Sequence, residues 1–246
     1  MQIEINTFIQ VNLKKLTNKT FSKKYISQYI TPIINNINNS EHKKFIIAGS
    51  QGAGKSTLAK LFKLVLENRY KKKVMLLSID DYYLSKNKRV KLSKKIHPLL
   101  ITRGVPGTHD IVALKNDIIN FQTKNFPITT PIFNKLKDDT SIKKKIIKNA
   151  EILLLEGWCC GSPSINTKYL FQNINRVETL LDKNKKWRQY YNSQLKMEYK
   201  KVFSLFDQQI YIEPPSFNYV LKWRYAQEKN NALKSRNKDF MNKKEL

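Results

Sequence analysis

Cysteine is scarce in this 246-residue sequence, and long apolar runs are missing from it. The two cysteines, Cys159 and Cys160, are adjacent, so they can build neither a disulfide framework nor a metal site. No apolar run approaches the roughly 20 residues that a membrane-spanning helix needs. The first residues lack the basic and then apolar pattern of a signal peptide. We therefore expect a protein of the reducing cytoplasm, without a membrane partner.

Acidic residues are also few, because 19 Asp and Glu stand against 46 Lys and Arg, for a net charge of +27. Such an excess is typical of nucleic-acid binding, since clustered cations release counterions from phosphate backbones. It is equally typical of a solvated lysine-rich surface that attracts small anions. The lysines lie in short clusters along the whole chain, without a basic tail or a recognised nucleic-acid module. We favour the second interpretation and do not expect nucleic acid as a partner.

The sequence does contain a complete phosphate-binding loop pattern. The apolar run Phe45–Ala48 predicts a buried parallel strand before it. Apolar residues at helical spacing predict an amphipathic helix behind it: Leu58, Leu61, Phe62 and Val65. The pattern Gly-x-x-x-x-Gly-Lys-Ser itself comprises Gly49, Ser50, Gln51, Gly52, Ala53, Gly54, Lys55 and Ser56, and Thr57 follows it as a further candidate contact of the nucleotide.

This loop predicts a site for ATP and Mg²⁺. Its glycines let the backbone turn N–H groups toward phosphate oxygens, and the following helix adds the positive end of its dipole. Lys55 can reach the β- and γ-phosphates, and the Ser56 hydroxyl can ligate Mg²⁺. A glycine-rich turn that binds nothing is the alternative, but every motif position and both flanking elements favour a nucleotide site.

Two further apolar strands end in acidic residues. The run Val74–Ile79 leads into Asp80 and Asp81, and Ile152–Leu155 leads into Glu156. Ligands of open α/β sheets bind at the carboxyl ends of strands. There Asp80 can hold Mg²⁺ through water or act as the base for an acceptor hydroxyl, and Glu156 can support Mg²⁺ and its waters. The alternative in both places is a turn capped by an acid; beside the phosphate-binding loop we prefer the functional interpretation.

A rigid loop with glycines and a proline runs from Arg103 to Asp110. Thr108 or Asp110 can cap the next helix. The apolar face of that helix comprises Ile111, Leu114, Ile118 and Phe121. Arg103 and His109 then lie near a helix N-terminus, where a substrate carboxylate or phosphate can bind. Taken alone, this pattern indicates a capped loop more than a binding site.

We expect a helical segment, residues 1–40, that packs on the core of a P-loop domain, residues 41–246. Within the domain, residues 127–135 look extended, and Gln209–Ile212 predicts the last strand. Residues 176–206 predict helices whose apolar side chains, beginning with Val177, Leu180 and Leu181, belong mostly to the core.

Together these motifs resemble one family, the plant-type D-glycerate 3-kinases with their yeast and bacterial kinase relatives. Residues 49–57, 78–84, 98–110 and 156–158 match the family in order, and Trp223-Arg224 with Glu228 also resembles it. The block Arg-Gly-x-x-Gly-Thr-His-Asp separates this group from the uridine, pantothenate and phosphoribulose kinases of the same superfamily.

The resemblance implies an α/β fold, the P-loop NTPase three-layer α/β/α sandwich with a mostly parallel five-stranded sheet. It implies transfer of the ATP γ-phosphoryl group to D-glycerate, a step of photorespiration in photosynthetic organisms. Lys55, Asp80, Arg103 and His109 would be catalytic, and Arg224 would face the nucleotide. Ser56, Asp80 and Glu156 would hold Mg²⁺. The acceptor side would comprise Asp81, Tyr83, Arg103, Thr108, His109, Asp110 and Lys135.

One departure concerns the acceptor side. The family has an aromatic-Asp-Lys triplet where this chain has Phe133-Asn134-Lys135. The difference leaves room for a kinase of another hydroxylated acceptor, such as pantothenate or uridine. The basic charge leaves room for a nucleic-acid-associated P-loop protein of low turnover.

Overall fold

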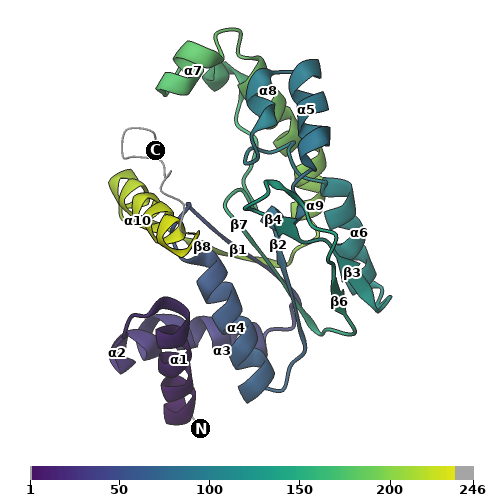
Figure 1. Cartoon of the computed structure of the whole chain (residues 1–246). Helices are drawn as coiled ribbons and strands as arrows, with labels where there is room; N and C mark the ends of the chain where they lie inside the picture. The colour runs from purple at the N-terminus through teal and green to yellow at the C-terminus, as the bar shows by residue number, and fades with distance from the viewer. Residues whose placement is uncertain (1, 236–246) are drawn as a thin grey trace.

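The computed structural model describes residues 2–235, with side chains for residues 3–226, and its centre is a parallel sheet (Figure 1). The sheet has the order β2-β7-β1-β8. Its strands are β1 (Lys44–Gly49), β2 (Val74–Ser78), β7 (Ile152–Gly157) and β8 (Gln208–Ile212). All neighbouring pairs are parallel, which requires a crossover between the strands of each pair. The α/β class is thus confirmed.

Helices cover both faces of this sheet. Successive side chains of a strand point to opposite faces, so the apolar strands place side chains on both faces that must be buried. In β1, Phe45 and Ile47 pack against α1 (Gln2–Thr17), α3 (Thr31–Asn39) and α4 (Lys55–Arg69). The alternate residues of the strand, Ile46 and Ala48, belong to a second core with α6 (Ile111–Gln122). The predicted apolar face of α6 is buried in this second core. The result is the predicted three-layer arrangement.

The prediction of five strands is wrong for the described part of the chain, where the central sheet has four. The predicted extended segment, residues 127–135, pairs locally instead of joining that sheet. Its first part, β3 (Ile128–Thr130), is antiparallel to β6 (Lys145–Ile147). Its second part, β4 (Phe133–Asn134), is antiparallel to β5 (Asp139–Thr140). The β4–β5 hairpin lies beside the end of β2, because the Asp81 carboxylate accepts the Phe133 N–H at 3.2 Å.

The N-terminal segment is helical as predicted. Between α1 and α3 it contains α2 (Lys23–Tyr25) and a π-helical turn, η1 (Ile26–Ile30). Isoleucines from these helices complete the core on the α4 side of the sheet: Ile5, Ile9, Ile26, Ile30, Ile34 and Ile37. Tyr25 and Tyr29 of the same segment are 44% and 53% exposed.

The segment after β7 is held by a buried arginine. It contains η4 (Thr167–Phe171), α7 (Arg176–Leu181), α8 (Lys186–Gln194), the π-helical turn η5 (Leu195–Tyr199) and α9 (Lys200–Phe203). The Arg188 guanidinium donates to Glu178 at 3.1 Å and to Asp182 at 2.8 Å, and all three side chains are buried. This cluster, not an apolar face, attaches α7 to the body of the protein.

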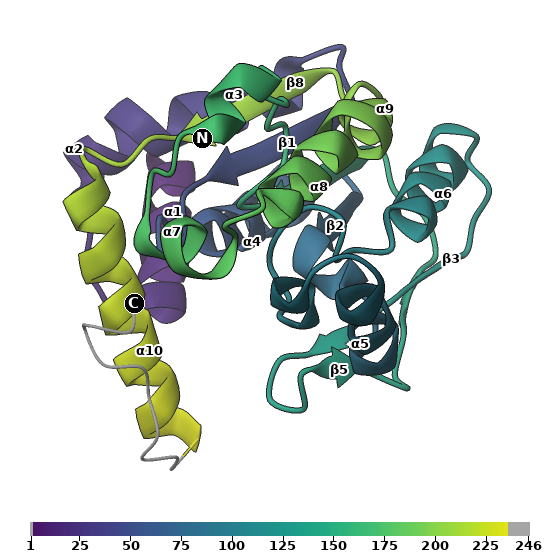
Figure 2. The same ribbon diagram turned by 90° about the horizontal axis from the view of Figure 1, so that it is seen from above.

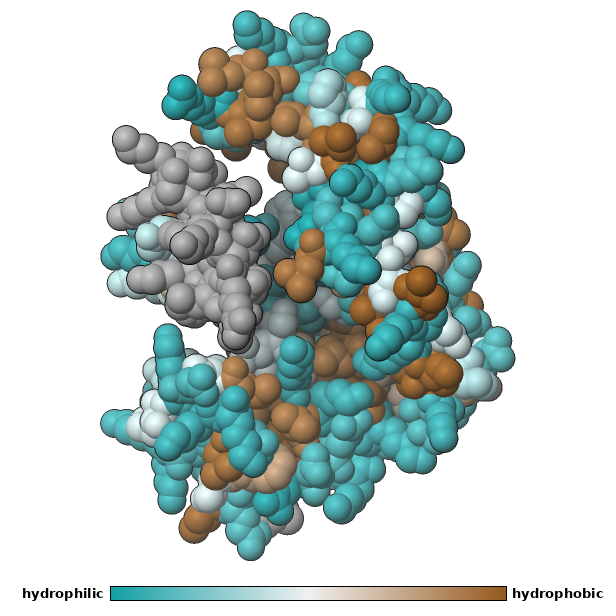
Figure 3. All heavy atoms as spheres, viewed as in Figure 1, coloured by the Kyte–Doolittle hydropathy of each residue, from teal (hydrophilic) through white to brown (hydrophobic). Residues whose placement is uncertain are grey.

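The prediction that Val177, Leu180 and Leu181 belong to the core is therefore wrong. They are 43%, 52% and 57% exposed, and Figure 3 shows apolar atoms gathered on the surface where Figure 1 places α7.

The remaining helices flank the carboxyl edge of the sheet. They are η2 (Ile79–Tyr82), α5 (Lys86–Lys95), η3 (Pro98–Ile101) and α10 (Phe217–Ser235). Figure 2 shows α10 on one side of α4, and α5 with β5 on the other. Over the described ranges, no helix is both long and apolar enough to cross a membrane.

Candidate active site

Three strands end at the same edge of the sheet and bring distant motifs together there. Ala48 of β1 pairs with Gly157 of β7, and Ser78 of β2 pairs with Glu156. The phosphate-binding loop after β1, Asp80 after β2 and Glu156 in β7 therefore lie at one edge, where ligands of open α/β sheets bind.

The loop has the backbone that its glycines predict. Gly49, Gly52 and Gly54 have φ angles of 146°, 77° and 88°, which residues with a side chain rarely adopt. Lys55 opens α4 with only 8% of its surface exposed, and its ammonium donates to the Ser50 carbonyl at 2.7 Å. Burial lowers the pKa of Lys55, while the charges of Glu156 and Asp80 oppose that shift. A partly desolvated cation at a helix N-terminus is suited to phosphate oxygens.

Helix α10 packs directly on this loop. A Cβ added to Gly52 would lie 2.7 Å from Trp223 Cβ and 3.3 Å from the backbone nitrogen of Arg224. The structure thus places the backbone of Arg224 beside the phosphate-binding loop; that its side chain faces the nucleotide stays a prediction. The side chain of Glu228, the third residue of that C-terminal match, lies outside the described residues.

Ser56 and Glu156 form a pair that fits a magnesium ion. The Ser56 hydroxyl donates to the Glu156 carboxylate at 3.0 Å, and Glu156 is 7% exposed. Mg²⁺ prefers oxygen ligands and is commonly held by one or two protein groups together with substrate phosphates and water. Among the described residues, no group of three or more His, Cys, Asp or Glu could hold a metal ion. The Ser56 hydroxyl and the Glu156 carboxylate supply two oxygen atoms of the kind that Mg²⁺ prefers.

Replacing Glu156 by glutamine should raise the Mg²⁺ concentration for half-maximal turnover about 10- to 100-fold, because a charged oxygen near the ion is lost. Magnesium titration of the kinase rate measures this. Glu151 precedes the other end of β7 and accepts the Lys73 N–H at 3.0 Å, so Glu151→Gln is the control. If both variants needed the same Mg²⁺ concentration, the assignment of Glu156 to the metal site would be contradicted.

Asp80 is held by Lys135. The Lys135 ammonium donates to the Asp80 carboxylate at 2.7 Å. Burial raises the pKa of Asp80, but the Lys135 charge and hydrogen bond outweigh it and leave the pKa below its ordinary value. Asp80 is therefore ionised at neutral pH and able to accept a hydrogen bond from a hydroxyl group.

Asn134 shapes the turn that carries Lys135. Its side-chain oxygen accepts the N–H groups of Leu136 and Lys137, both at 3.1 Å. An aspartate could accept the same two bonds. The asparagine at position 134, where the family has aspartate, thus forms the turn with its side-chain oxygen.

The pair of Asp80 and Lys135 makes a prediction about pH. Replacing Lys135 by methionine removes the charge that lowers the Asp80 pKa, so that pKa should rise. The acidic limb of the pH profile of kcat/KM should then move to higher pH. Lys137→Met, in the same turn, is the control and should leave the limb in place. An unmoved limb in Lys135→Met would show that protonation of Asp80 does not control the rate.

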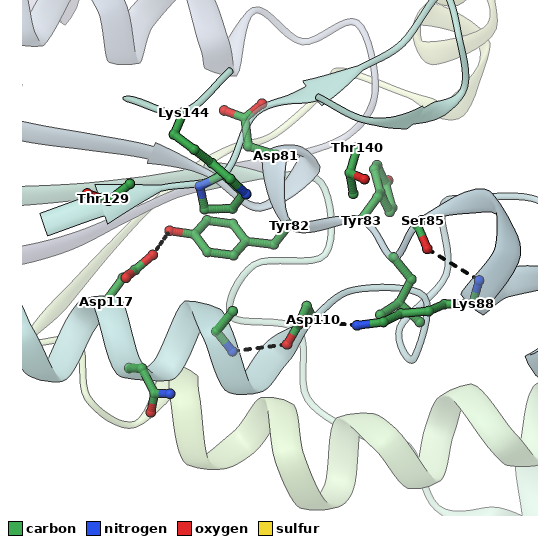
Figure 4. Close-up of a pocket in the computed structure, with 14 residues that line it drawn as sticks. Asp81, Tyr82, Tyr83, Ser85, Lys88, Asp110, Asp117, Thr129, Thr140 and Lys144 are labelled. Atoms are coloured by element: carbon green, nitrogen blue, oxygen red, sulfur yellow. Dashed lines mark hydrogen bonds and ion pairs between the residues drawn. The ribbon is translucent and has the colours of Figure 1, made fainter. Parts of the chain in front are cut away.

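The neighbouring acids face a different space. Asp81 accepts the Phe133 N–H, and burial raises its pKa. Asp110 caps α6, as predicted, by accepting the Ala113 N–H at 3.1 Å. Both line a cavity of about 500 Å³ that Tyr83 and Asp117 also line. Figure 4 shows Asp81 on the hairpin side of this cavity and Asp110 on the α6 side. No phosphate-loop residue lines it, so the predicted acceptor residues are divided between two places.

Arg103 links its loop to the β4–β5 hairpin, and Thr108 stabilises the loop itself. Arg103 forms an ion pair with Asp138. The Thr108 side chain is fully buried; its hydroxyl donates to the Val105 carbonyl at 2.7 Å and accepts the Gly104 N–H at 3.2 Å. Both side chains thus have partners within the protein.

Sequence reasoning missed Arg89, which also holds this region together. Arg89 is fully buried and donates to the Ile101 carbonyl at 2.7 Å and to the Asp138 carboxylate at 2.8 Å. A single arginine in an otherwise lysine-rich helix was the available signal, because arginine is preferred for buried multidentate bonds.

His109 is the most buried of the predicted acceptor residues with a titratable side chain. It is 4% exposed, and its ring stacks on Tyr83 with centroids 4.3 Å apart. Burial lowers the pKa of His109 to about 3, so the ring is neutral. Its Nδ1 atom lies 2.6 Å from the hydroxyl of Tyr199, a residue that the sequence assigned only to the core.

A phosphate-binding loop, an acid-supported serine and an ionised aspartate at one sheet edge define the class as a P-loop nucleotide-binding protein. An uncharacterised kinase of Schizosaccharomyces pombe is 32% identical over 218 residues, which cover 80% of this chain and 73% of that protein. The chain belongs to the P-loop kinase family that includes this yeast kinase and the plant-type D-glycerate 3-kinases. It is a phosphotransferase with an alcohol group as acceptor.

Other similarities are weaker or cover less of the chain. Chloroplastic D-glycerate 3-kinase of Arabidopsis thaliana is 25% identical over 190 residues, covering 72% of this chain and 39% of that protein. Pantothenate kinase of Ligilactobacillus salivarius is 30% identical over 112 residues, covering 45% and 35%. The structure of D-glycerate 3-kinase from Cryptococcus neoformans superimposes with a TM-score of 0.71 at 23% identity, covering 98% of this chain and 81% of that one. No family model matches the chain.

Proposed function

We propose that this kinase transfers the γ-phosphoryl group of ATP to the 3-hydroxyl of D-glycerate and releases 3-phosphoglycerate and ADP. The observation that carries the proposal is the pair of Asp80 and Lys135 at 2.7 Å, which stands at the same sheet edge as the phosphate-binding loop. A carboxylate and an ammonium side by side suit a small acceptor that itself carries a hydroxyl and a carboxylate. The similarity to plant D-glycerate 3-kinase supports this choice of acceptor.

Each residue has one part in the proposed reaction. The loop N–H groups and Lys55 bind the β- and γ-phosphates, and Arg224 approaches the nucleotide from α10. Ser56 and Glu156 would hold Mg²⁺, which when bound neutralises charge on the phosphate oxygens. Asp80 orients the acceptor hydroxyl and takes its proton.

The bond changes balance without a covalent intermediate on the protein. The acceptor oxygen forms a bond to the γ-phosphorus, and the bond from that phosphorus to the β–γ bridging oxygen breaks. ADP leaves with the bridging oxygen. The protein contributes positioning and charge neutralisation.

A second acceptor is pantothenate, favoured by the pantothenate kinase that matches 112 residues of this chain. Pantothenate also carries a hydroxyl and a carboxylate, but it is longer. The two acceptors therefore require a direct comparison.

The test is ADP release by the purified protein with ATP, Mg²⁺ and one of four acceptors: D-glycerate, L-glycerate, pantothenate or uridine. We expect turnover with D-glycerate alone, and none in the control variant Lys55→Ala. Turnover with pantothenate or uridine alone would replace the proposed acceptor. No turnover with any acceptor, while ATP still binds, would contradict the proposal and leave room for the low-turnover nucleic-acid-associated protein that the basic charge suggested.

A further inference from the structure

His109 carries a buried polar atom that has no partner. Its Nδ1 atom is hydrogen-bonded to the Tyr199 hydroxyl. Its Nε2 atom is shielded from solvent and has no hydrogen-bond partner in the described structure. Buried polar atoms of folded proteins are almost always paired, because an unpaired one loses its bonds to water without replacement. The atom is therefore a candidate contact for a bound molecule.

The hydrogen bonds around Tyr199 determine which ring nitrogen carries the proton. The Gly107 N–H can only donate, and it donates to the Tyr199 hydroxyl oxygen at 2.8 Å. The hydroxyl proton is then free to point at Nδ1 of His109, 2.6 Å away. Nδ1 accepts this proton, so the proton of the neutral ring lies on Nε2.

The opposite arrangement would leave a second buried group unpaired. If Nδ1 donated to Tyr199, that oxygen would accept two bonds and its own proton would need another acceptor. Tyr199 is fully buried, and the structure provides no such acceptor for it within the described residues. The contacts therefore select the Nε2–H form.

We propose that Tyr199 is a positioning residue that fixes His109 as its Nε2–H tautomer, so that His109 offers one neutral donor to an oxygen of the phosphoryl acceptor. The proposal rests on the kinase function proposed above. Tyr83 contacts both groups, because its ring stacks on His109 and its side chain is hydrogen-bonded to Asp80. One small acceptor can thus meet both groups, with its hydroxyl at Asp80 and a second oxygen at His109.

This arrangement indicates which class of acceptor can bind, and it requires a side chain next to His109 to move. The acceptor needs an oxygen with a free lone pair near the hydroxyl that reacts, as a hydroxy acid or a small polyol has. Since Nε2 is shielded from solvent, the acceptor must displace a neighbouring side chain to reach it. Tyr83, stacked on the ring, is one such neighbour.

The first test needs no substrate. The chain has three histidines, and nitrogen-15 NMR of their imidazole rings distinguishes the two tautomers, with His109→Gln to assign the His109 signals. We expect the Nε2–H form in the wild type, unchanged between pH 6 and 8, and a loss of that single form in Tyr199→Phe. Tyr190→Phe is the control, because the Tyr190 hydroxyl contacts the Gly107 carbonyl at 3.4 Å but not His109. An Nδ1–H signal in the wild type, or an unchanged spectrum in Tyr199→Phe, would overturn the proposal.

The second test uses whichever acceptor is phosphorylated. Tyr199→Phe should raise the KM for the acceptor about tenfold, the effect of one hydrogen bond, and leave the KM for ATP in place. The amide nitrogen of glutamine reaches the position of Nε2, whereas that of asparagine reaches only Nδ1. We therefore expect His109→Gln to keep about tenfold more kcat/KM than His109→Asn. Equal losses in these two variants would overturn the donor role. If nothing in the panel is phosphorylated, the proposed function fails, and the spectra alone decide whether Tyr199 fixes the tautomer.

Discussion

Replacing Asp80 by asparagine is expected to lower kcat about 10³-fold, within the range that a positioned general base contributes. Asparagine keeps the shape of the side chain but cannot take the proton of the acceptor hydroxyl. It also leaves Lys135 without its ion-pair partner. ATP binding should change little, because the phosphates are bound by the loop and Lys55. Steady-state kinetics for kcat and calorimetric titration with ATP measure the two effects.

The adjacent residue provides the matched control. Asp81 has the same side chain, but it faces the 500 Å³ cavity and accepts the Phe133 N–H. Asp81→Asn should therefore cost less than about tenfold in kcat, since it lacks the proton-transfer role. Similar losses in both variants would show that the acids act through the local fold. If kcat of the Asp80→Asn variant fell by less than tenfold, Asp80 would not be the general base.

Replacing Arg188 by methionine should destabilise the segment after β7 by about 3–5 kcal/mol, because two buried carboxylates lose the guanidinium that donates to both of them. Glu178 and Asp182 are 3% and 1% exposed, so water cannot replace the guanidinium without opening the segment. Proteolysis within residues 162–186 should become faster, and the thermal midpoint should fall by about 10 °C if that segment unfolds with the rest.

A second variant separates charge from packing. Arg188→Met combined with Glu178→Gln and Asp182→Asn removes all three charges and should recover much of the lost stability. If the triple variant is no more stable than the single one, the arginine acts mainly through the backbone carbonyls that it also binds, such as those of Leu170 and Asp182. A single variant as stable as the wild type would contradict the assigned role of the cluster.

The sheet and the phosphate loop could be predicted because their signals are local. Apolar runs such as Phe45–Ala48 and Ile152–Leu155 identify buried strands, and parallel order then brings their carboxyl ends together. The glycine spacing of residues 49–54 specifies a backbone that few other residues adopt. These features follow from neighbouring residues alone.

The rest depends on contacts between distant residues. Asp80 and Asp81 are equivalent in the sequence, and only the short η2 helix turns them toward different spaces. The hydrogen bond between the side chains of His109 and Tyr199 joins residues 90 positions apart in the sequence. Leu180 and Leu181 have a helical apolar pattern, yet the polar cluster around Arg188 attaches their helix and leaves them exposed. No local pattern encodes these outcomes.

The strand order also determines when the chain can fold. β1 is synthesised early, but it pairs with strands made much later: Lys44 with Leu153, and Phe45 with Gln208. Such long loops close slowly, so we expect slow folding with a strong dependence on topology. On the ribosome, the apolar faces of β1 and α4 emerge well before β8 can complete the sheet. During most of its synthesis this kinase therefore exposes apolar surface that can aggregate. We expect the yield of folded protein in cells to depend more on the supply of chaperones than on the stability of the finished fold.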